Sequence, residues 1–195
     1  MKRPKTARLF VISAPSGCGK TTLCNKLLRE KIGLANSVSM TTRQRRPGEK
    51  KGIDYRFVSK KRFLEMIKKK EFLEYEDNFG ELYGTPKKFI EDNLKKGKSV
   101  LLSIDVKGAM KVRKAYPKKS VLIFVLPPSI NALKARLRSR MSEDPESIEK
   151  RLGVARKELQ FKNRYDYSVV NDKLASAYKK LKEIIVSELN NIKER

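Results

Sequence analysis

The residues best suited to chemistry lie near the start of the chain, in the stretch SAPSGCGKTT (13–22). Gly17 and Gly19 allow a tight turn that exposes backbone N–H groups, and Lys20 brings a mobile cation to an anion held in that turn. The apolar run LFVI precedes the turn, and the helical pattern TTLCNKLLREK follows it. The N-terminal end of a helix carries partial positive charge, which also favours an anion. The stretch therefore predicts a phosphate-binding loop between a strand and a helix.

The pattern typical of such loops is G-x-x-x-x-G-K-[ST]. The chain satisfies it at Gly19, Lys20 and Thr21, but Ala14 stands where the first glycine belongs. An ordinary glycine-rich turn between strand and helix is the alternative interpretation. The rest of the chain must decide between the two.

Length and composition indicate one compact domain with small inserted lobes, because 195 residues with 39% hydrophobic content can bury a sizeable core. The sequence offers no apolar run of the ~20 residues that a membrane span needs. The first apolar run leads directly into the phosphate loop, unlike a signal peptide, so we predict a cytoplasmic protein without membrane contact. With two cysteines and no histidine, neither a zinc site, a disulfide framework nor histidine base chemistry is expected.

The charge is strongly positive, with 47 Lys and Arg against 22 Asp and Glu, a formal net charge of +25. Such a charge attracts polyanions, so a basic nucleic-acid binder is one alternative function. Much of the excess lies in runs such as KKRFLEMIKKK, which are typical of solvated helix faces. The sequence has no RNA-binding aromatic strand or zinc finger, so we expect no specific nucleic-acid partner.

Strands and helices alternate along much of the chain. Three further apolar runs predict buried parallel strands: SVLLSID (99–105), SVLIFVL (120–126) and YSVVN (167–171). Helical patterns are SINALKARLRSR, ESIEKRLGVARKELQ and DKLASAYKKLKEIIVSELNNI. The alternation predicts an α/β fold, a parallel sheet with helices on both faces.

Two segments interrupt this alternation. From about Ser39 to Pro86 the chain is rich in Thr, Arg, Tyr and Gly, with short strand patterns such as DYRFVS and FLEYEDNFGELYG, which predicts a separate lobe. The stretch RSRMSEDPESIEKR has a polar, proline-containing break between two helices and predicts a second movable piece.

Four stretches resemble the guanylate kinase family, in the order found there, and the resemblance spans nearly the whole chain. They are SAPSGCGKTT, SVSMTTRQRRPGEKKGIDY, EFLEYEDNFGELYGTP and SIDVKGA. Bacterial members commonly have alanine at the start of the loop, so Ala14 fits the resemblance. It implies a P-loop kinase that transfers a phosphoryl group from ATP to GMP with Mg²⁺. The implied division of residues 1–195 is a core (1–38, 97–130 and 152–195), a mixed α+β GMP-binding lobe (39–96) and a helical lid (131–151).

The resemblance assigns Lys20 to the β- and γ-phosphates of ATP and Thr21 to magnesium, partly through water. The residues implied in ATP binding are Ala14, Pro15, Ser16, Gly17, Cys18, Gly19, Lys20, Thr21, Thr22, Arg136 and Asn171. Arg136 and Asn171 are placed near the adenine. Cys18 is interpreted as a small packing residue, since isolated thiols usually are.

On the acceptor side, arginine and tyrosine donors can hold one phosphate, and a carboxylate can accept from both guanine N1–H and the 2-amino group. The residues implied in GMP binding are Ser39, Arg43, Arg46, Tyr55, Glu74, Tyr83, Thr85 and Asp105. Arg45 is assigned to solvent. Taken alone, the basic loop could be solvated and Glu74 could be an exposed edge charge.

Arginines that stabilise charge during transfer complete the predicted site. Residues implied in catalysis are Lys20, Arg43, Arg140 and Arg151, the last two from the lid. In so basic a chain, surface solvation is the alternative for each lid arginine.

One residue departs from the family pattern. Guanylate kinases usually have D-I-D at the end of the second core strand, where this chain has Ser103, Ile104 and Asp105. The missing first carboxylate predicts weaker handling of Mg²⁺.

Two other classes of function remain as alternatives. A P-loop sugar-phosphate kinase, such as a ribose 1,5-bisphosphate phosphokinase, would not need the guanine-binding set. A non-catalytic guanylate-kinase-like interaction module would not need Lys20 and Thr21.

Overall fold

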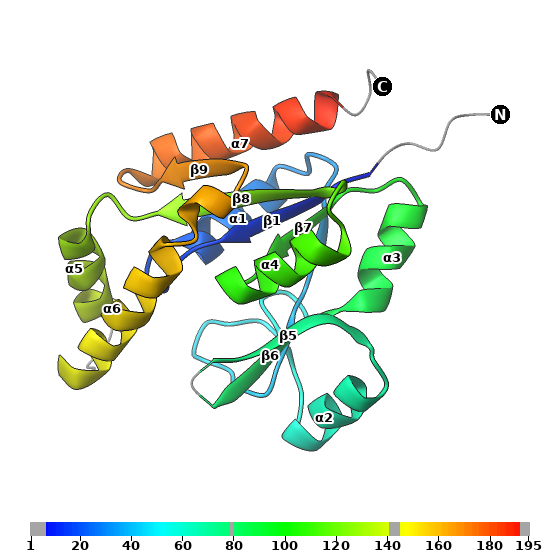
Figure 1. The fold of residues 1–195 in the computed structure, drawn as a ribbon, viewed down its shortest axis with the longest axis horizontal. Coiled ribbons are helices and arrows are strands. Elements are labelled where there is room, and N and C mark those ends of the chain that lie inside the picture. Colours follow the sequence, from blue (N-terminus) through cyan, green and yellow to red (C-terminus); the bar gives the residue numbers. More distant parts are fainter. Residues whose placement is uncertain (1–6, 79, 141–144, 192–195) are drawn as a thin grey trace.

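The computed structural model describes residues 7–78, 80–140 and 145–191, and it contains two sheets (Figure 1). The larger sheet has five strands in the order β2-β7-β1-β8-β9, and every adjacent pair is parallel. Its strands are β1 (Leu9–Ser13), β2 (Ala35–Ser37), β7 (Val100–Ser103), β8 (Ser120–Leu126) and β9 (Tyr167–Val170). The predicted α/β fold with a parallel sheet is confirmed.

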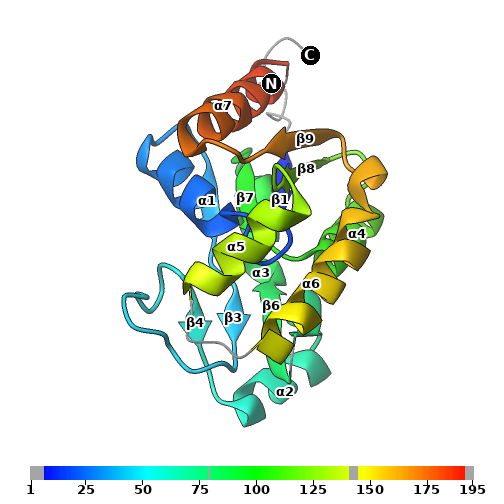
Figure 2. The ribbon, with the colours of Figure 1, turned by 90° about the vertical axis from the view of Figure 1, so that its left-hand side faces the viewer.

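Helices cover both faces of the large sheet. Side chains alternate between the two faces along each strand, so each strand contributes to two hydrophobic clusters. Phe10 and Ile12 belong to the hydrophobic cluster that includes α1 (Lys20–Arg29) and α7 (Leu174–Asn190). Leu9 and Val11 belong to the cluster on the other face, beneath α3 (Lys87–Lys95) and α4 (Val106–Ala115). Figure 2 shows α1 and α4 on opposite sides of the strands.

The smaller sheet lies below the large one in Figure 1 and has the order β4-β3-β6-β5. Its strands are β3 (Met40–Thr41), β4 (Arg56–Phe57), β5 (Phe72–Asn78) and β6 (Glu81–Pro86), with α2 (Lys60–Lys68) packed beside them. We call residues 39–86, most of the predicted GMP-binding lobe (39–96), the acceptor lobe after that prediction. Its own hydrophobic cluster is small, with Phe63, Met66 and Phe72 buried at its centre.

Two helices project on the left of Figure 1, α5 (Ile130–Arg140) and α6 (Pro145–Leu159). They contact each other, and Lys134 and Glu149 form an ion pair between them. A short 3₁₀ helix (Lys162–Arg164) then leads into β9. The predicted lid (131–151) thus includes most of α5 and the first half of α6.

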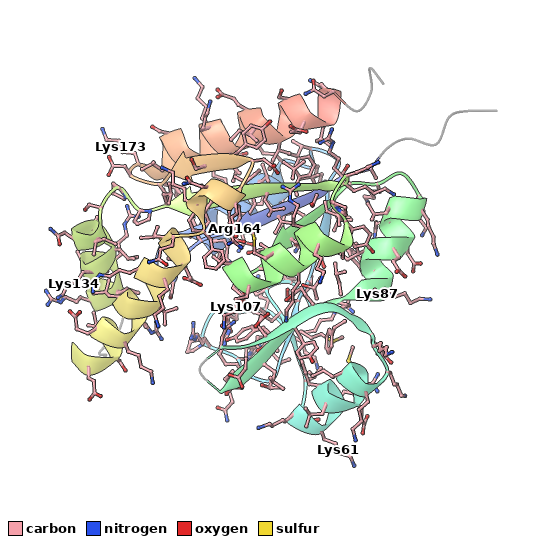
Figure 3. All side chains as sticks on the ribbon, viewed as in Figure 1. Lys61, Lys87, Lys107, Lys134, Arg164 and Lys173 are labelled. Atoms are coloured by element: carbon pink, nitrogen blue, oxygen red, sulfur yellow. The ribbon has the colours of Figure 1, made fainter. Side chains whose placement is uncertain are left out.

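Positively charged side chains are found on many segments of the chain. Figure 3 labels six cations on six different segments, from Lys61 on α2 to Lys173 before α7. Within the three described ranges, every helix is too short or too polar to cross a bilayer.

Candidate active site

The loop after β1 has the geometry that its glycines predict. Gly17 and Gly19 have φ of 90° and 83°, a region that side-chain-bearing residues rarely adopt. Gly19 also precedes Lys20, the first residue of α1, so the loop ends at a helix N-terminus. The loop and the start of α1 line one cavity, an arrangement that suits a phosphate.

Asn171, at the end of β9, supports this loop from behind. Its Nδ2 donates a hydrogen bond to the Cys18 carbonyl at 2.8 Å, and its side chain is buried. A Cβ on Gly19 would lie 2.4 Å from that Nδ2, so the loop passes this amide as closely as glycine permits.

Arg136 reaches the same strand end from α5. Its two terminal nitrogens donate to the Asn171 carbonyl at 2.9 Å and the Asp172 carbonyl at 3.2 Å. Both Arg136 and Asn171, assigned by resemblance to the adenine, thus bind backbone carbonyls. The sequence contained no signal for these bonds.

Lys20 points along the end of β7, where its Nζ donates to the Ile104 carbonyl at 2.7 Å. Burial lowers the pKa of this lysine, and the nearby groups Cys24, Asp105 and Glu158 act against the shift. An ammonium ion held here gains from any anion that enters the loop, because an opposite charge offsets its desolvation.

A cavity of about 320 Å³ joins the phosphate loop to the acceptor lobe. The residues that line it come from the loop, from the lobe, from the end of β7 and from α6. From the predicted site they are Ala14, Pro15, Ser16, Gly17, Cys18, Gly19, Lys20, Thr21, Thr22, Ser39, Arg46, Tyr55, Glu74, Tyr83, Asp105 and Arg151. Segments far apart in the sequence therefore share one space.

A second cavity of about 190 Å³ adjoins the first. It is lined by the residues predicted to donate hydrogen bonds to the phosphate of the acceptor nucleotide. Arg43 donates from Nε to the Tyr83 hydroxyl at 3.2 Å and from Nη2 to Glu49 Oε1 at 2.7 Å. Its guanidinium lies 5.5 Å from the centre of the Tyr55 ring. Glu49 also accepts from the Arg46 backbone N–H at 2.8 Å, so it orders the loop that carries both arginines.

Glu74 lies on β5 and is only 6% exposed. Thr85 donates its hydroxyl hydrogen bond to Glu74 Oε1 from the neighbouring strand β6. Burial raises the pKa of Glu74 to about 7, and the neighbouring Asp105 carboxylate acts in the same direction. A buried carboxylate at a cavity wall is suited to accept hydrogen bonds from a ligand's N–H groups.

Asp105 caps α4, accepting from the Gly108 backbone N–H at 2.7 Å through Oδ1. Its Oδ2 accepts from Asn78 Nδ2 at 2.8 Å. The core helix and strand β5 of the acceptor lobe are thus joined beside Glu74.

The predicted lid contributes Arg151 to the cavity, together with Val154 and Glu158 of α6. Burial, and secondly the Asp105 charge, raises the pKa of Glu158 to about 7. The side chain of Arg140 lies outside the part of the chain that the structure describes. Arg45 is exposed, as expected.

Sequence reasoning missed Asn78 and Glu158, both of which line the cavity. Asn78 lies four residues after Glu74 on one strand and therefore on the same face. Glu158 lies seven residues after Arg151, the spacing of one helix face. Periodicity could have identified both.

Ser103, the departure from D-I-D, lines both cavities. Burial raises the pKa of the Cys24 thiol, and the neighbouring Ser103 acts against this shift. A hydroxyl and a thiol thus lie close to Lys20 where the family has a carboxylate.

Comparisons with known proteins agree with this geometry. The model of the guanylate kinase family matches residues 6–188. A guanylate kinase of Wolbachia pipientis wMel is 46% identical over 96% of this chain and 94% of its own length. A second, from Oceanobacillus iheyensis, is 46% identical over 92% of the chain and 87% of its own.

A solved structure agrees as well. The crystal structure of guanylate kinase from Anaplasma phagocytophilum superposes with a TM-score of 0.81 at 36% identity, covering 95% of this chain and 87% of that one. The phosphate loop, the acceptor lobe and the sequence relationship lead to the same result: the chain belongs to the guanylate kinase family.

Proposed function

We propose that the chain transfers the γ-phosphoryl group of ATP to GMP, giving ADP and GDP, with residues in and beside its two cavities in the following roles. The observation that carries this proposal is the shared cavity. One wall is the phosphate loop with Lys20, and the other bears Glu74 and the Arg46, Tyr55 and Tyr83 donors. A donor and an acceptor nucleotide bound to these walls would meet phosphate to phosphate.

On the donor side, the loop amides and Lys20 hold the ATP phosphates. The Lys20 ammonium neutralises charge that grows on the β–γ bridging oxygen as the bond to the γ-phosphorus breaks. Arg151 lies on α6 at the same cavity and approaches the phosphates when the lid closes. We propose the same role for Arg140.

On the acceptor side, Arg43, Arg46, Tyr55 and Tyr83 hold the GMP phosphate, and Ser39 and Thr85 contribute hydroxyls near the base. Glu74 accepts from guanine N1–H and the 2-amino group. Adenine has an acceptor at N1 instead, so the same carboxylate would repel it.

The donor set near the loop fits a magnesium ion carried in by ATP. Thr21, Ser103 and Asp105 line the cavity and have oxygen atoms as their side-chain donors, and Mg²⁺ takes oxygen ligands while keeping waters and substrate phosphates. We propose that the Thr21 hydroxyl contacts the ion directly or through water. The ion would neutralise phosphate charge during transfer.

The step itself needs no nucleophilic side chain. A GMP phosphate oxygen attacks the γ-phosphorus, the bond to the bridging oxygen breaks, and ADP leaves with that electron pair. The protein supplies alignment and charge stabilisation.

A coupled assay of ADP release, with GMP, AMP, CMP and UMP as acceptors, tests this function. We expect turnover with GMP and far less with the other three. Equal rates with all four would reject the guanine assignment. With ribose 1,5-bisphosphate as a fifth acceptor, a preference for it would favour the sugar-phosphate kinase, and no turnover with any acceptor would favour an interaction module. The family comparisons favour neither alternative.

The division into core, acceptor lobe and lid also stays a proposal, as does the cytoplasmic location. ATP and GMP are the partners proposed here. A mobility shift with nucleic acid that GMP and ATP fail to displace would point to a further polyanionic partner.

A further inference from the structure

The start of helix α4 packs against Glu74, the residue that we assign to guanine recognition. Gly108 is the third residue of α4 and is buried. A Cβ placed on it would lie 2.6 Å from Glu74 Oε2 and 3.0 Å from Glu74 Cδ. The same Cβ would lie 3.3 Å from Asp105 Oδ1. The Glu74 carboxylate therefore occupies the volume that any side chain at position 108 would need.

Glu74 has little room to move away from this contact. Its other oxygen is held by the Thr85 hydroxyl, and its strand is fixed to α4 one turn further on. There Lys111 donates to the Tyr75 carbonyl at 2.8 Å and pairs with Glu76 at 2.6 Å. A displaced Glu74 side chain would have to break the Thr85 bond or rotate into the cavity.

We propose that Gly108 is a positioning residue for guanine recognition. Because it has no side chain, Glu74 can lie at the cavity wall with both carboxylate oxygens placed to bind the guanine. This inference rests on the proposed function. It assigns guanine selectivity partly to the core helix, and the residue acts only through Glu74.

A glycine inside a helix is ordinarily less favourable than alanine, so Gly108 is not explained by helix stability. Gly153 of α6 provides the matched comparison. It too lies inside a helix, but a Cβ there would meet no atom of the described residues within 4 Å. The same substitution at the two positions separates the contact with Glu74 from the helix effect.

The first experiment compares Gly108→Ala with Gly153→Ala in steady-state kinetics. For Gly108→Ala we expect the KM for GMP to rise about tenfold, the KM for ATP to stay within twofold, and the preference for GMP over AMP to fall. Gly153→Ala should match the unsubstituted protein in all three. An unchanged GMP KM in a folded Gly108→Ala protein would overturn the inference.

The second experiment repeats Gly108→Ala in a Glu74→Ala background, with GMP binding measured by calorimetry. Removing the carboxylate frees the space at position 108, so the added methyl should then change GMP affinity by less than twofold. An equal loss in both backgrounds would show that Gly108 acts elsewhere and would reject the proposal.

Folding is checked by circular dichroism in every variant. If Gly108→Ala unfolds alone but folds in the Glu74→Ala background, the steric conflict with Glu74 is supported. If it unfolds in both, the conflict lies with another group and the proposal fails. The unsubstituted protein supplies the separate test of function: should it not phosphorylate GMP, the proposed function fails, whatever the variants do.

Discussion

At the scale of single residues, Lys20 makes the sharpest prediction. Its ammonium is desolvated and directed by the Ile104 carbonyl, so it is already in place before charge develops on the phosphates. We expect Lys20→Ala to lower kcat by about 10²–10³, the effect of losing one preorganised charge-stabilising donor. Lys88→Ala, an exposed site on α3, serves as the control. A loss below about threefold in folded Lys20→Ala protein would remove this lysine from the mechanism.

Glu74 predicts a pH dependence. Its pKa is raised to about 7, and guanine binding needs the ionised form, so protons compete with GMP. The expected result is that kcat/KM for GMP falls as the pH is lowered from 8 to 6, since this parameter reports groups of the free enzyme.

The matched variant is Glu74→Gln, which keeps the shape and removes the titrating carboxyl. It should lose much of the preference for GMP over AMP and lose the Glu74 step of the pH profile, which leaves the titrations of the substrate phosphate, with a pKa of about 6, and of Glu158, whose pKa burial raises to about 7. Identical pH profiles for the two proteins would mean that another group controls GMP binding.

Ser103 predicts an altered requirement for magnesium. Its hydroxyl brings no negative charge to the cavity, and ATP phosphates supply most of the metal affinity, so the enzyme should work but need more Mg²⁺. In Ser103→Asp, half-maximal rate at fixed ATP and GMP should come at lower magnesium. Ser103→Asn, of similar shape and neutral, is the control. Superimposable magnesium curves for all three folded proteins would show that this position has no part in metal handling.

At the scale of elements, the strand, turn and helix of the phosphate loop depend on the end of β9. Gly19→Ala would strain a positive φ and also displace the Asn171 amide. Gly33 has a similar φ of 87°, but no described atom lies within 4 Å of the methyl that alanine would add, so Gly33→Ala isolates the strain. Gly33→Ala should lose about 1–2 kcal/mol of unfolding free energy in urea, and Gly19→Ala should lose more, because it also disturbs a buried hydrogen bond. Only Gly19→Ala should also lose at least about tenfold in kcat/KM for ATP. Equal kinetic effects would show that the Asn171 contact is irrelevant to the loop.

The sequence predicted those elements whose own residues carry the signal. β1, β7 and β8 are apolar runs buried on both faces, and the turn after β1 follows from its glycines. The edge strand β2 was missed because it has three residues, Ala35–Ser37, with no apolar run. β3 is two residues long and is defined by its partners, whereas β4 lies within the predicted strand pattern DYRFVS.

A motif or a resemblance predicted which residues lie at the cavity. The sequence did not predict the hydrogen bonds and close contacts that depend on how distant segments pack together. Glu74 lies at the cavity together with the loop residues, as the motifs suggested. The bonds from Arg136 and Asn171 to backbone carbonyls depend on how β9 ends beside the loop. The close approach of Gly108 to Glu74 joins a core helix to a strand of the acceptor lobe, and no local pattern encodes it.

For the whole molecule, the large sheet and the acceptor lobe differ greatly in the size of their hydrophobic clusters. The large sheet is packed between extensive clusters on both faces, whereas the acceptor lobe is centred on Phe63, Met66 and Phe72. Buried apolar area dominates folding free energy, so the lobe should open on its own at a smaller cost than the core.

That difference is measurable by native-state hydrogen exchange. Amides of β5 and β6 should exchange faster than those of β1 and β8, through local unfolding of the lobe. On the proposed function GMP binds only the folded lobe, so at 100 times its Kd it should slow by about 100-fold the exchange of every amide whose opening unfolds the lobe, including core amides that exchange by global unfolding. ATP alone should not protect the lobe in this way. Equal exchange in the two sheets would show that they unfold as one cooperative unit, and the binding energy of the acceptor would then stabilise the entire chain.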